Sequence, residues 1–129
     1  NDVDLIPWDP FCKEHPLTQR IGHEPVRVED DIDGTHIGDF YLSAYCVPHS
    51  TLLSTEEKEA TKMNEANKWQ GIYVYREERM LVAHEWFRLR ARESHANSFR
   101  DELKFDYKLD EDFQLDFKKT RFGKVFSFF

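Results

Sequence analysis

The sequence predicts an α+β domain in which a mixed or antiparallel sheet is covered on one face by a helix. Short runs of alternating apolar and polar residues recur along the chain, and this period of two is typical of half-buried strands. One segment, residues 55–67, instead has a helix start signal and an apolar stripe at helical spacing. Because several strands and one substantial helix must share one core, a sheet with a helical layer is favoured.

The first two strands are predicted on either side of Asp33-Gly34, a dipeptide that strongly indicates a hairpin turn. Valines alternate with charged residues over 26–29, and residues 36–47 alternate over a longer run. One face of this longer run should lie on the core, because it carries Phe40, Leu42, Ala44 and Cys46.

The helix is predicted to begin at Thr55, because Ser54 and Glu57 have the spacing of a capping box. Four more strands are predicted after it from runs of apolar residues that mostly alternate with polar ones: 72–75, 80–83, 103–109 and 113–117. The element order is therefore β-β-α-β-β-β-β.

Residues 1–24 are predicted to form an extended arm or linker, because three prolines interrupt any helix or central strand there. Residues 25–129 are predicted to form the domain itself, whose size suits a single core. The chain begins with Asn1 rather than Met, so we expect it to be part of a longer protein whose N-terminal domain precedes the arm.

Composition excludes several classes of function. The formal net charge of −7 argues against a general nucleic-acid surface, which needs an excess of Lys and Arg. No apolar stretch approaches the roughly 20 residues that cross a membrane, so no membrane partner is expected. Cys12 and Cys46 lie far apart in an otherwise cysteine-free chain, which favours two buried thiols in a reducing compartment. We therefore expect a cytoplasmic protein.

Metal and hydrolase sites are not predicted. The six histidines lack the spacing of zinc ligands, and Arg88 stands where a metalloprotease helix starting at His84 would need its second histidine. Residues 29–34 resemble the start of a calcium loop, but Phe40 occupies the position of its bidentate glutamate. No G-x-S-x-G elbow is present for a nucleophilic serine.

A row of arginines is the first candidate site. Arg88, Arg90 and Arg92 alternate with apolar residues, so in an extended segment all three would point the same way. They would then bind phosphates or an acidic partner. The alternative is a solvated strand edge that its charges protect against aggregation.

The basic loop at 118–124 is the second candidate site. It places four cations directly after the strand that is predicted to end at Phe117, beginning with Lys118 and Lys119. A lysine at a strand end is a mobile point charge that is suited to a phosphate bound by a neighbouring domain. The alternative is a loop that is merely soluble.

Four motifs resemble the second domain of bacterial GHKL-type ATP-binding proteins, the superfamily of Hsp90, gyrase B and MutL that includes MORC-like ATPases. Their residues are Trp8–Phe11 with His15-Pro16, Gln70–Arg76, Arg79–Ala83 and Leu115–Thr120. The most distinctive is the hairpin sequence Q-G-I-Y-V-Y-R. The resemblance touches most of the chain.

This resemblance implies a transducer domain with a ribosomal protein S5 domain 2-like fold. It also implies that Lys119, with Lys118 as the fallback, contacts the γ-phosphate of ATP held with Mg²⁺ by an N-terminal domain of the same chain. Phe117 departs from the family pattern, which has Gln there. The five glycines are scattered and form no phosphate-binding loop, so no cofactor is expected in this domain alone, although ATP and Mg²⁺ are implied for the longer protein. A homodimer remains open.

Two other classes of function remain as alternatives. One is a non-catalytic protein-interaction module that acts through a sheet edge or the row of Arg88, Arg90 and Arg92. The other is a small stand-alone enzyme, which would need a concave pocket with convergent polar groups away from Lys119.

Overall fold

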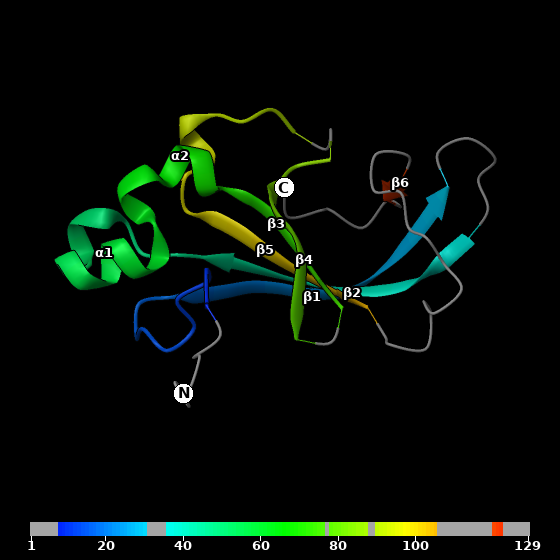
Figure 1. Cartoon of the computed structure of the whole chain (residues 1–129), viewed down its shortest axis with the longest axis horizontal. Helices are drawn as coiled ribbons and strands as arrows, with labels where there is room; N and C mark the ends of the chain where they lie inside the picture. Colours follow the sequence, from blue (N-terminus) through cyan, green and yellow to red (C-terminus); the bar gives the residue numbers. More distant parts are fainter. Residues whose placement is uncertain (1–7, 31–35, 77, 88–89, 106–119, 123–129) are drawn as a thin grey trace, which may run out of the picture.

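A computed structural model describes residues 8–30, 36–76, 78–87, 90–105 and 120–122, and the statements below concern these residues. Its centre is one mixed sheet in the order β4-β3-β5-β2-β1-β6 (Figure 1). Neighbouring strands are antiparallel except for the parallel pair β3–β5. The strands are β1 Gln19–Asp30, β2 His36–Cys46, β3 Gly71–Arg76, β4 Arg79–Glu85, β5 Phe99–Phe105 and β6 Thr120–Phe122.

Both predicted hairpins are confirmed. Strand β1 pairs with β2 so that Val26 lies opposite Phe40, while the predicted turn at Asp33-Gly34 lies outside the described residues. Strand β3 pairs with β4, and Arg76 lies opposite Arg79. The alternation of side chains along these strands is enough to predict both pairs.

The later strands differ in part from the prediction. Strand β5 begins at Phe99, four residues before the predicted start at Leu103, because Phe99 already pairs with Cys46 of β2. The predicted strand 113–117 lies outside the described residues. Residues 120–122 form β6 rather than the predicted loop, because they pair with the end of β1. Pairing with a distant strand leaves no signal in a three-residue segment.

The single helix predicted over 55–67 is wrong in its extent. Helix α1 spans Thr55–Thr61, and after a 3-10 turn, η2 at Met63–Glu65, the helix α2 spans Ala66–Trp69. The capping box is confirmed, since the backbone N–H of Ser54 donates to Glu57 Oε1 at 2.8 Å and that of Glu57 donates to Ser54 Oγ at 3.1 Å. The break comes at Lys62, whose left-handed backbone (φ 59°) ends α1.

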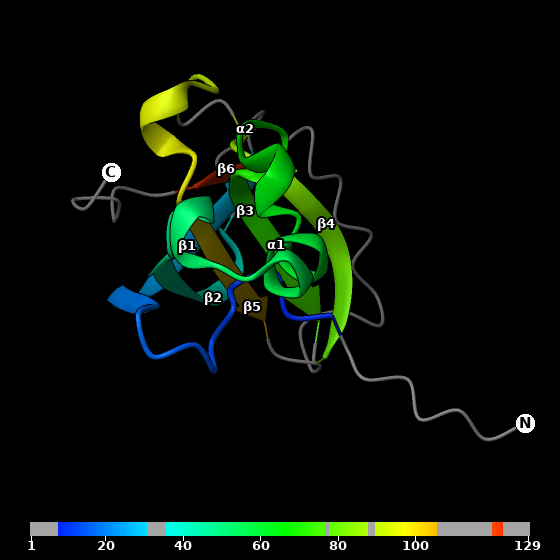
Figure 2. The ribbon, with the colours of Figure 1, turned by 90° about the vertical axis from the view of Figure 1, so that its left-hand side faces the viewer.

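The helices gather at one end of the sheet and do not lie across a face (Figure 1), as the view onto that end also shows (Figure 2). Two further 3-10 turns, η1 at Ser50–Leu52 and η3 at Ser94–Ala96, connect the strands. The prediction that a helix covers the sheet is therefore wrong in its detail, while the α+β class is confirmed. No helix in the described ranges is long and apolar enough to span a membrane.

Residues 8–18, predicted as an extended arm, instead fold onto one face of the sheet. Phe11 is 1% exposed and its ring lies against those of Tyr45, Tyr73 and Tyr75. The predicted arm also extends too far, because β1 already begins at Gln19. Proline interrupts regular structure, as expected, but does not prevent an irregular segment from packing.

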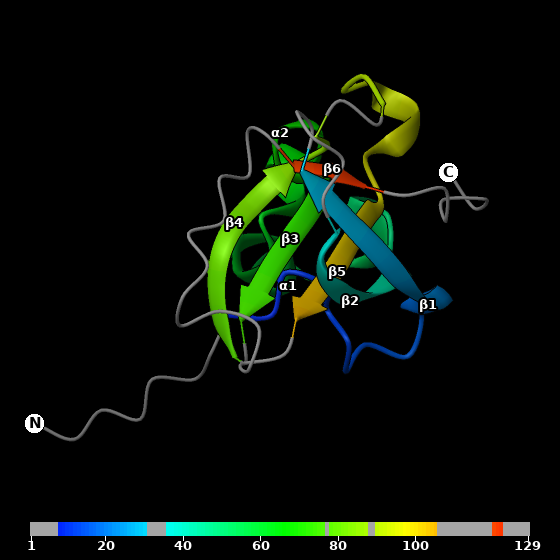
Figure 3. The same cartoon turned by 90° about the vertical axis from the view of Figure 1, so that its right-hand side faces the viewer.

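The opposite face of the sheet carries the main apolar core. Its buried residues come from three adjacent strands and from the segment after β4, and they are Phe40, Leu42, Ile72, Val74, Trp86, Ala96, Leu103 and Phe105. The strands that supply this core cross with a progressive twist (Figure 3). The two faces thus differ in composition, aliphatic and phenylalanine on one and tyrosine on the other.

Candidate functional site

The basic loop falls mostly outside what the structure describes. Lys118, Lys119 and Arg88 are not among the described residues. The residue after Lys119, Thr120, is the first residue of β6 and pairs with Asp30 of β1. The described end of this loop is therefore held by the sheet, at the margin opposite β4.

Arg92 binds the protein's own backbone. Its Nη1 donates to the carbonyl oxygens of Asn67 and Lys68 at 2.8 Å and of Gln70 at 3.0 Å, and its Nη2 donates to that of His84 at 2.6 Å. The first three carbonyls lie at the end of α2, where helix carbonyls lack partners. Arg92 therefore ties the end of α2 to β4, and these hydrogen bonds compete with any phosphate.

Arg90 is packed against aromatic rings. Its guanidinium carbon lies 5.2 Å from the ring centroid of Trp86 and 5.9 Å from that of Phe99. Because Arg90 and Arg92 meet different internal partners, the described part of the predicted arginine row does not form one exposed surface. Sequence alternation could not reveal this, since the described residues 90–93 do not form a strand.

Gln70 is the centre of a buried polar network that the sequence did not indicate. Its side chain is fully buried and accepts a hydrogen bond from Trp86 Nε1 at 2.9 Å. Its Nε2 donates to the carbonyl oxygen of Glu93 at 2.8 Å and to Asn97 Oδ1 at 3.0 Å. The network joins the start of β3 to the connection between β4 and β5, so this glutamine of the hairpin motif has a structural role.

Asp101 is a buried carboxylate in the middle of β5. It is 1% exposed, and its Oδ2 has no hydrogen-bond partner among the described residues. Burial raises the pKa of Asp101 well above its ordinary value, while the charge of Arg90 and a backbone hydrogen bond from Tyr45 act in the opposite direction. The folded protein therefore holds a proton here that the unfolded chain releases at lower pH.

Replacing Asp101 with Asn should stabilise the protein increasingly as the pH rises. Because the pKa of Asp101 is higher in the folded protein than in the unfolded chain, where it is about 4, proton binding at Asp101 stabilises the wild type fully only below pH 4. This contribution to the free energy of unfolding is lost as the pH rises through the folded-state pKa. The substituted amide does not titrate, so the advantage of Asp101→Asn in urea unfolding should grow from pH 4 upward. Glu59→Gln, which removes an exposed carboxylate from α1, controls for net charge. An equal effect at every pH would contradict this account.

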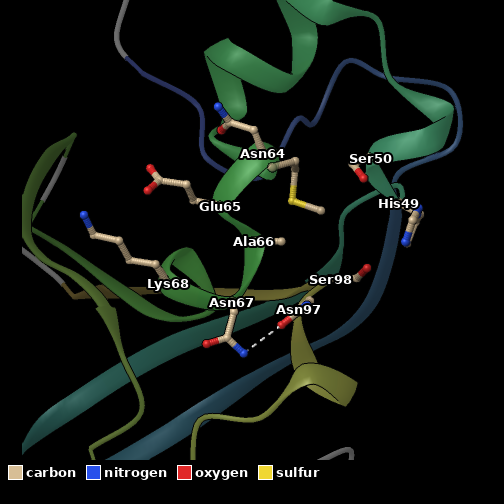
Figure 4. Close-up of a pocket in the computed structure, with 10 residues that line it drawn as sticks. His49, Ser50, Asn64, Glu65, Ala66, Asn67, Lys68, Asn97 and Ser98 are labelled. Carbon is tan, nitrogen blue, oxygen red and sulfur yellow. Dashed lines mark hydrogen bonds between the residues drawn. The ribbon is translucent and has the colours of Figure 1, made fainter.

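An open cavity of about 490 Å³ lies between η1, the segment from η2 to α2, and residues 97–98 (Figure 4). Glu65 and Lys68 extend away from Ser50 and Ser98 in this view, and the rest of the lining combines amide and hydroxyl groups with His49, Met63 and Ala66. His49 Nδ1 already bonds Thr51 Oγ1 at 2.9 Å, so that nitrogen is not directed at a lining serine. The cavity thus offers neutral hydrogen-bonding groups and no nucleophile with a base among its described lining residues.

The described residues contain no group of three or more His, Cys, Asp or Glu side chains placed to hold a metal ion. Cys12 and Cys46 are both free thiols, and burial raises the pKa of each. Their thiolate forms are therefore disfavoured, which makes them poor nucleophiles.

Comparison with known proteins finds no match for this chain among protein-family models, curated proteins or solved structures.

Proposed function

We propose that this chain is the transducer module of a GHKL-type ATPase, in which Lys119 contacts the γ-phosphate of ATP bound by a separate N-terminal domain. The basis is the resemblance of the Q-G-I-Y-V-Y-R hairpin and of the loop at Lys118-Lys119-Thr120. In this proposal ATP and Mg²⁺ belong to the other domain, and this module has an S5 domain 2-like fold. Its mixed α+β sheet is compatible with that fold.

The observation that best supports the proposal is the pairing of β6 with β1. Thr120 is the first residue of β6, and Lys119 is joined to it by one peptide bond. The backbone of a lysine next to a paired strand moves together with the sheet, and the long lysine side chain is able to reach a phosphate outside the domain. Positioned positive charge stabilises a transferring phosphoryl group, so hydrolysis would be coupled to movement of the sheet.

Two positions of the hairpin motif have structural roles in this fold. Gln70 anchors the buried network, and Gly71 has a positive φ of 130°. The first two residues of the motif therefore fix the backbone conformation and the buried contacts at the start of β3. By contrast, the alternative interaction module loses part of its basis, since Arg90 and Arg92 contact internal partners.

In the full-length protein, Lys119→Ala should lower ATP turnover about 100-fold or more, because removing one positioned charge-stabilising group typically has this effect. ATP affinity, measured separately by calorimetry, should change only a few-fold. Lys118→Ala is the matched control and should retain turnover within about threefold, as a neighbouring lysine outside the phosphate contact.

Two outcomes would contradict this assignment. If Lys118→Ala abolishes turnover and Lys119→Ala does not, the phosphate contact belongs to Lys118. If neither variant changes turnover, the transducer proposal itself fails.

A further inference from the structure

Residues 8–18 form a unit whose backbone-to-backbone hydrogen bonds stay within the segment. Asp9 accepts from the backbone N–H groups of Phe11 and Lys13, and the N–H of His15 and of Thr18 donate to carbonyls within the same segment. In the described residues, no backbone-to-backbone hydrogen bond joins this unit to a strand. The segment can therefore separate from the sheet without breaking its own turns.

The surface beneath this segment has the chemistry of a protein interface. Tyr45, Tyr73 and Tyr75 receive the Phe11 ring, and Arg100 and Glu102 lie on the same face of β5. Interfaces are enriched in tyrosine and arginine, whose polar ends tolerate water when the partner leaves. The opposite face of the sheet holds aliphatic and phenylalanine side chains instead, which have no such tolerance.

Contacts along its length hold the segment. The Trp8 ring lies edge-on to the rings of Trp69 and Tyr73, and His15 Nε2 lies 3.7 Å from Glu57 Oε2. Trp8 Nε1 donates to the carbonyl of Ala60 at 2.6 Å, and Phe11 fills the tyrosine pocket. Lys13 Nζ lies 2.7 Å from Glu102 Oε2. The carbonyl of Pro10 accepts from Arg100 Nη1 at 2.8 Å.

Open cavities flank the segment on both sides, so the contact is narrow. One of about 380 Å³ lies between Phe11, Lys13 and the sheet residues Tyr75 and Glu102. The other, of about 460 Å³, lies between the segment and α1, where Glu57 and Ala60 form part of the lining. A segment that belonged to the core would be close-packed on both sides.

We propose that residues 8–18 are a detachable strap, and that the tyrosine-lined face is its docking surface. Arg100 is its positioning residue, because one guanidinium binds the strap through Pro10 and the end of α1 through Thr61. Undocking exposes Arg100 and Glu102 to water, together with the rings of Phe11 and of the three tyrosines.

The regulatory meaning of the strap rests on the proposed function. If an ATP-binding domain precedes this module, the strap is the connection between them. Its docking would make the sheet move with that domain, and its release would let the two move separately. Nucleotide would then shift the population of the docked state.

Native-state hydrogen exchange on the full chain tests the docking itself. Amides of residues 8–18 should exchange at least about tenfold faster than those at the centres of β2 and β5, since a local opening needs less free energy than global unfolding. Phe11→Ala should raise the exchange rates of the strap amides about tenfold further and leave the exchange rates of those two strands within about threefold of wild type. Leu103→Ala, on the opposite face, is the control and should raise the exchange rates of both the strap and the two strands.

Equal exchange of the strap and the strands in wild type would overturn the proposal, as would equal acceleration of both by Phe11→Ala. If Phe11→Ala does not fold, Lys13→Ala is the milder variant. It removes the pair with Glu102, which lies at a partly exposed position, and should accelerate the strap alone. Acceleration of the strands by Lys13→Ala would again show that the segment belongs to the core.

A second arm separates this inference from the proposed function. In the full-length protein, saturating ATP should change strap exchange at least about threefold, and Lys119→Ala should abolish that change. If Lys119→Ala lowers turnover but ATP leaves strap exchange unchanged, the regulatory role is wrong and the ATPase assignment stands. If Lys119→Ala leaves turnover unchanged, the ATPase assignment fails. Hydrogen exchange of residues 8–18 in the wild-type protein still decides whether the strap detaches.

Discussion

Replacing Gly71 with Ala is expected to destabilise the protein by about 3 to 5 kcal/mol, combining backbone strain and overpacking. Gly71 has a φ of 130°, a conformation that L side chains rarely adopt. A Cβ placed there would lie 2.7 Å from the carbonyl carbon of His84 and 2.8 Å from the backbone nitrogen of Glu85. Both are backbone atoms of β4, so relief requires the β3–β4 pairing to shift.

Urea unfolding followed by circular dichroism measures this effect. Gly22→Ala is the matched control, because Gly22 lies in β1 of the same sheet and has no positive φ. We expect it to stay within about 1 kcal/mol of wild type. A Gly71→Ala variant as stable as Gly22→Ala would show that the start of β3 adapts, and that Gly71 in the hairpin motif is not required by geometry.

Replacing Arg100 with Met is expected to cost about 3 to 5 kcal/mol, as when a buried charged group is removed and its partners remain. Arg100 is fully buried, and its guanidinium donates to the carbonyls of Pro10 and Thr61 and to the sulfur of Met63. Burial lowers the pKa of Arg100 without placing a carboxylate among these acceptors. Without the guanidinium the two carbonyls lose their donor, and each unsatisfied group costs about 1 to 3 kcal/mol.

Lys104→Met tests whether this cost is specific. Lys104 points to the same face of β5, four residues further along, but its side chain is 51% exposed and 3.8 Å from Glu102. An exposed ion pair of this kind contributes at most about 1 kcal/mol, so Lys104→Met should unfold near the wild-type urea midpoint. Similar losses in both variants would mean that Arg100 acts through general charge rather than through its buried contacts.

Local patterns in the sequence determined the two hairpins, that is, strands β1 to β4 and the pairing within each hairpin. The alternation over residues 36–47 predicted β2, and Asp33-Gly34 predicted that β1 pairs with it. The capping box at Ser54 and Glu57 predicted where α1 begins. These signals were sufficient because each depends on neighbours in the chain, whose geometry is nearly independent of the rest of the fold.

The end of α1 and the extent of β5 were not predictable in the same way. Lys62 ends α1 although the polar sequence continues without Gly or Pro, and the break lets Met63 turn toward the buried Arg100. Phe99 joins β5 because Cys46 of β2 lies opposite it. Both boundaries depend on partners that are distant in the sequence.

For the candidate sites, the sequence could suggest residue types but not their partners. It offered Arg90 and Arg92 as part of one row, with a solvated strand edge as the alternative, whereas Arg92 binds four backbone carbonyls and Arg90 lies against Trp86. Lys118 and Lys119 remain a prediction that lies outside the described residues. Buried polar groups such as Gln70 left no signal, because burial is a property of the assembled layers.

The sequence by itself determined an α+β domain with two hairpins, the start of its helix and the two clusters of basic residues. Only the tertiary structure decided which segment covers each face: residues 8–18 lie on the tyrosine face, where the end of α1 also contacts Arg100. The physical reason is the separation along the sequence between the residues that interact. Strand period and capping follow from interactions between near neighbours, whereas the cover of a face and the partners of Arg92 and Arg100 depend on which distant segments bury the most surface together.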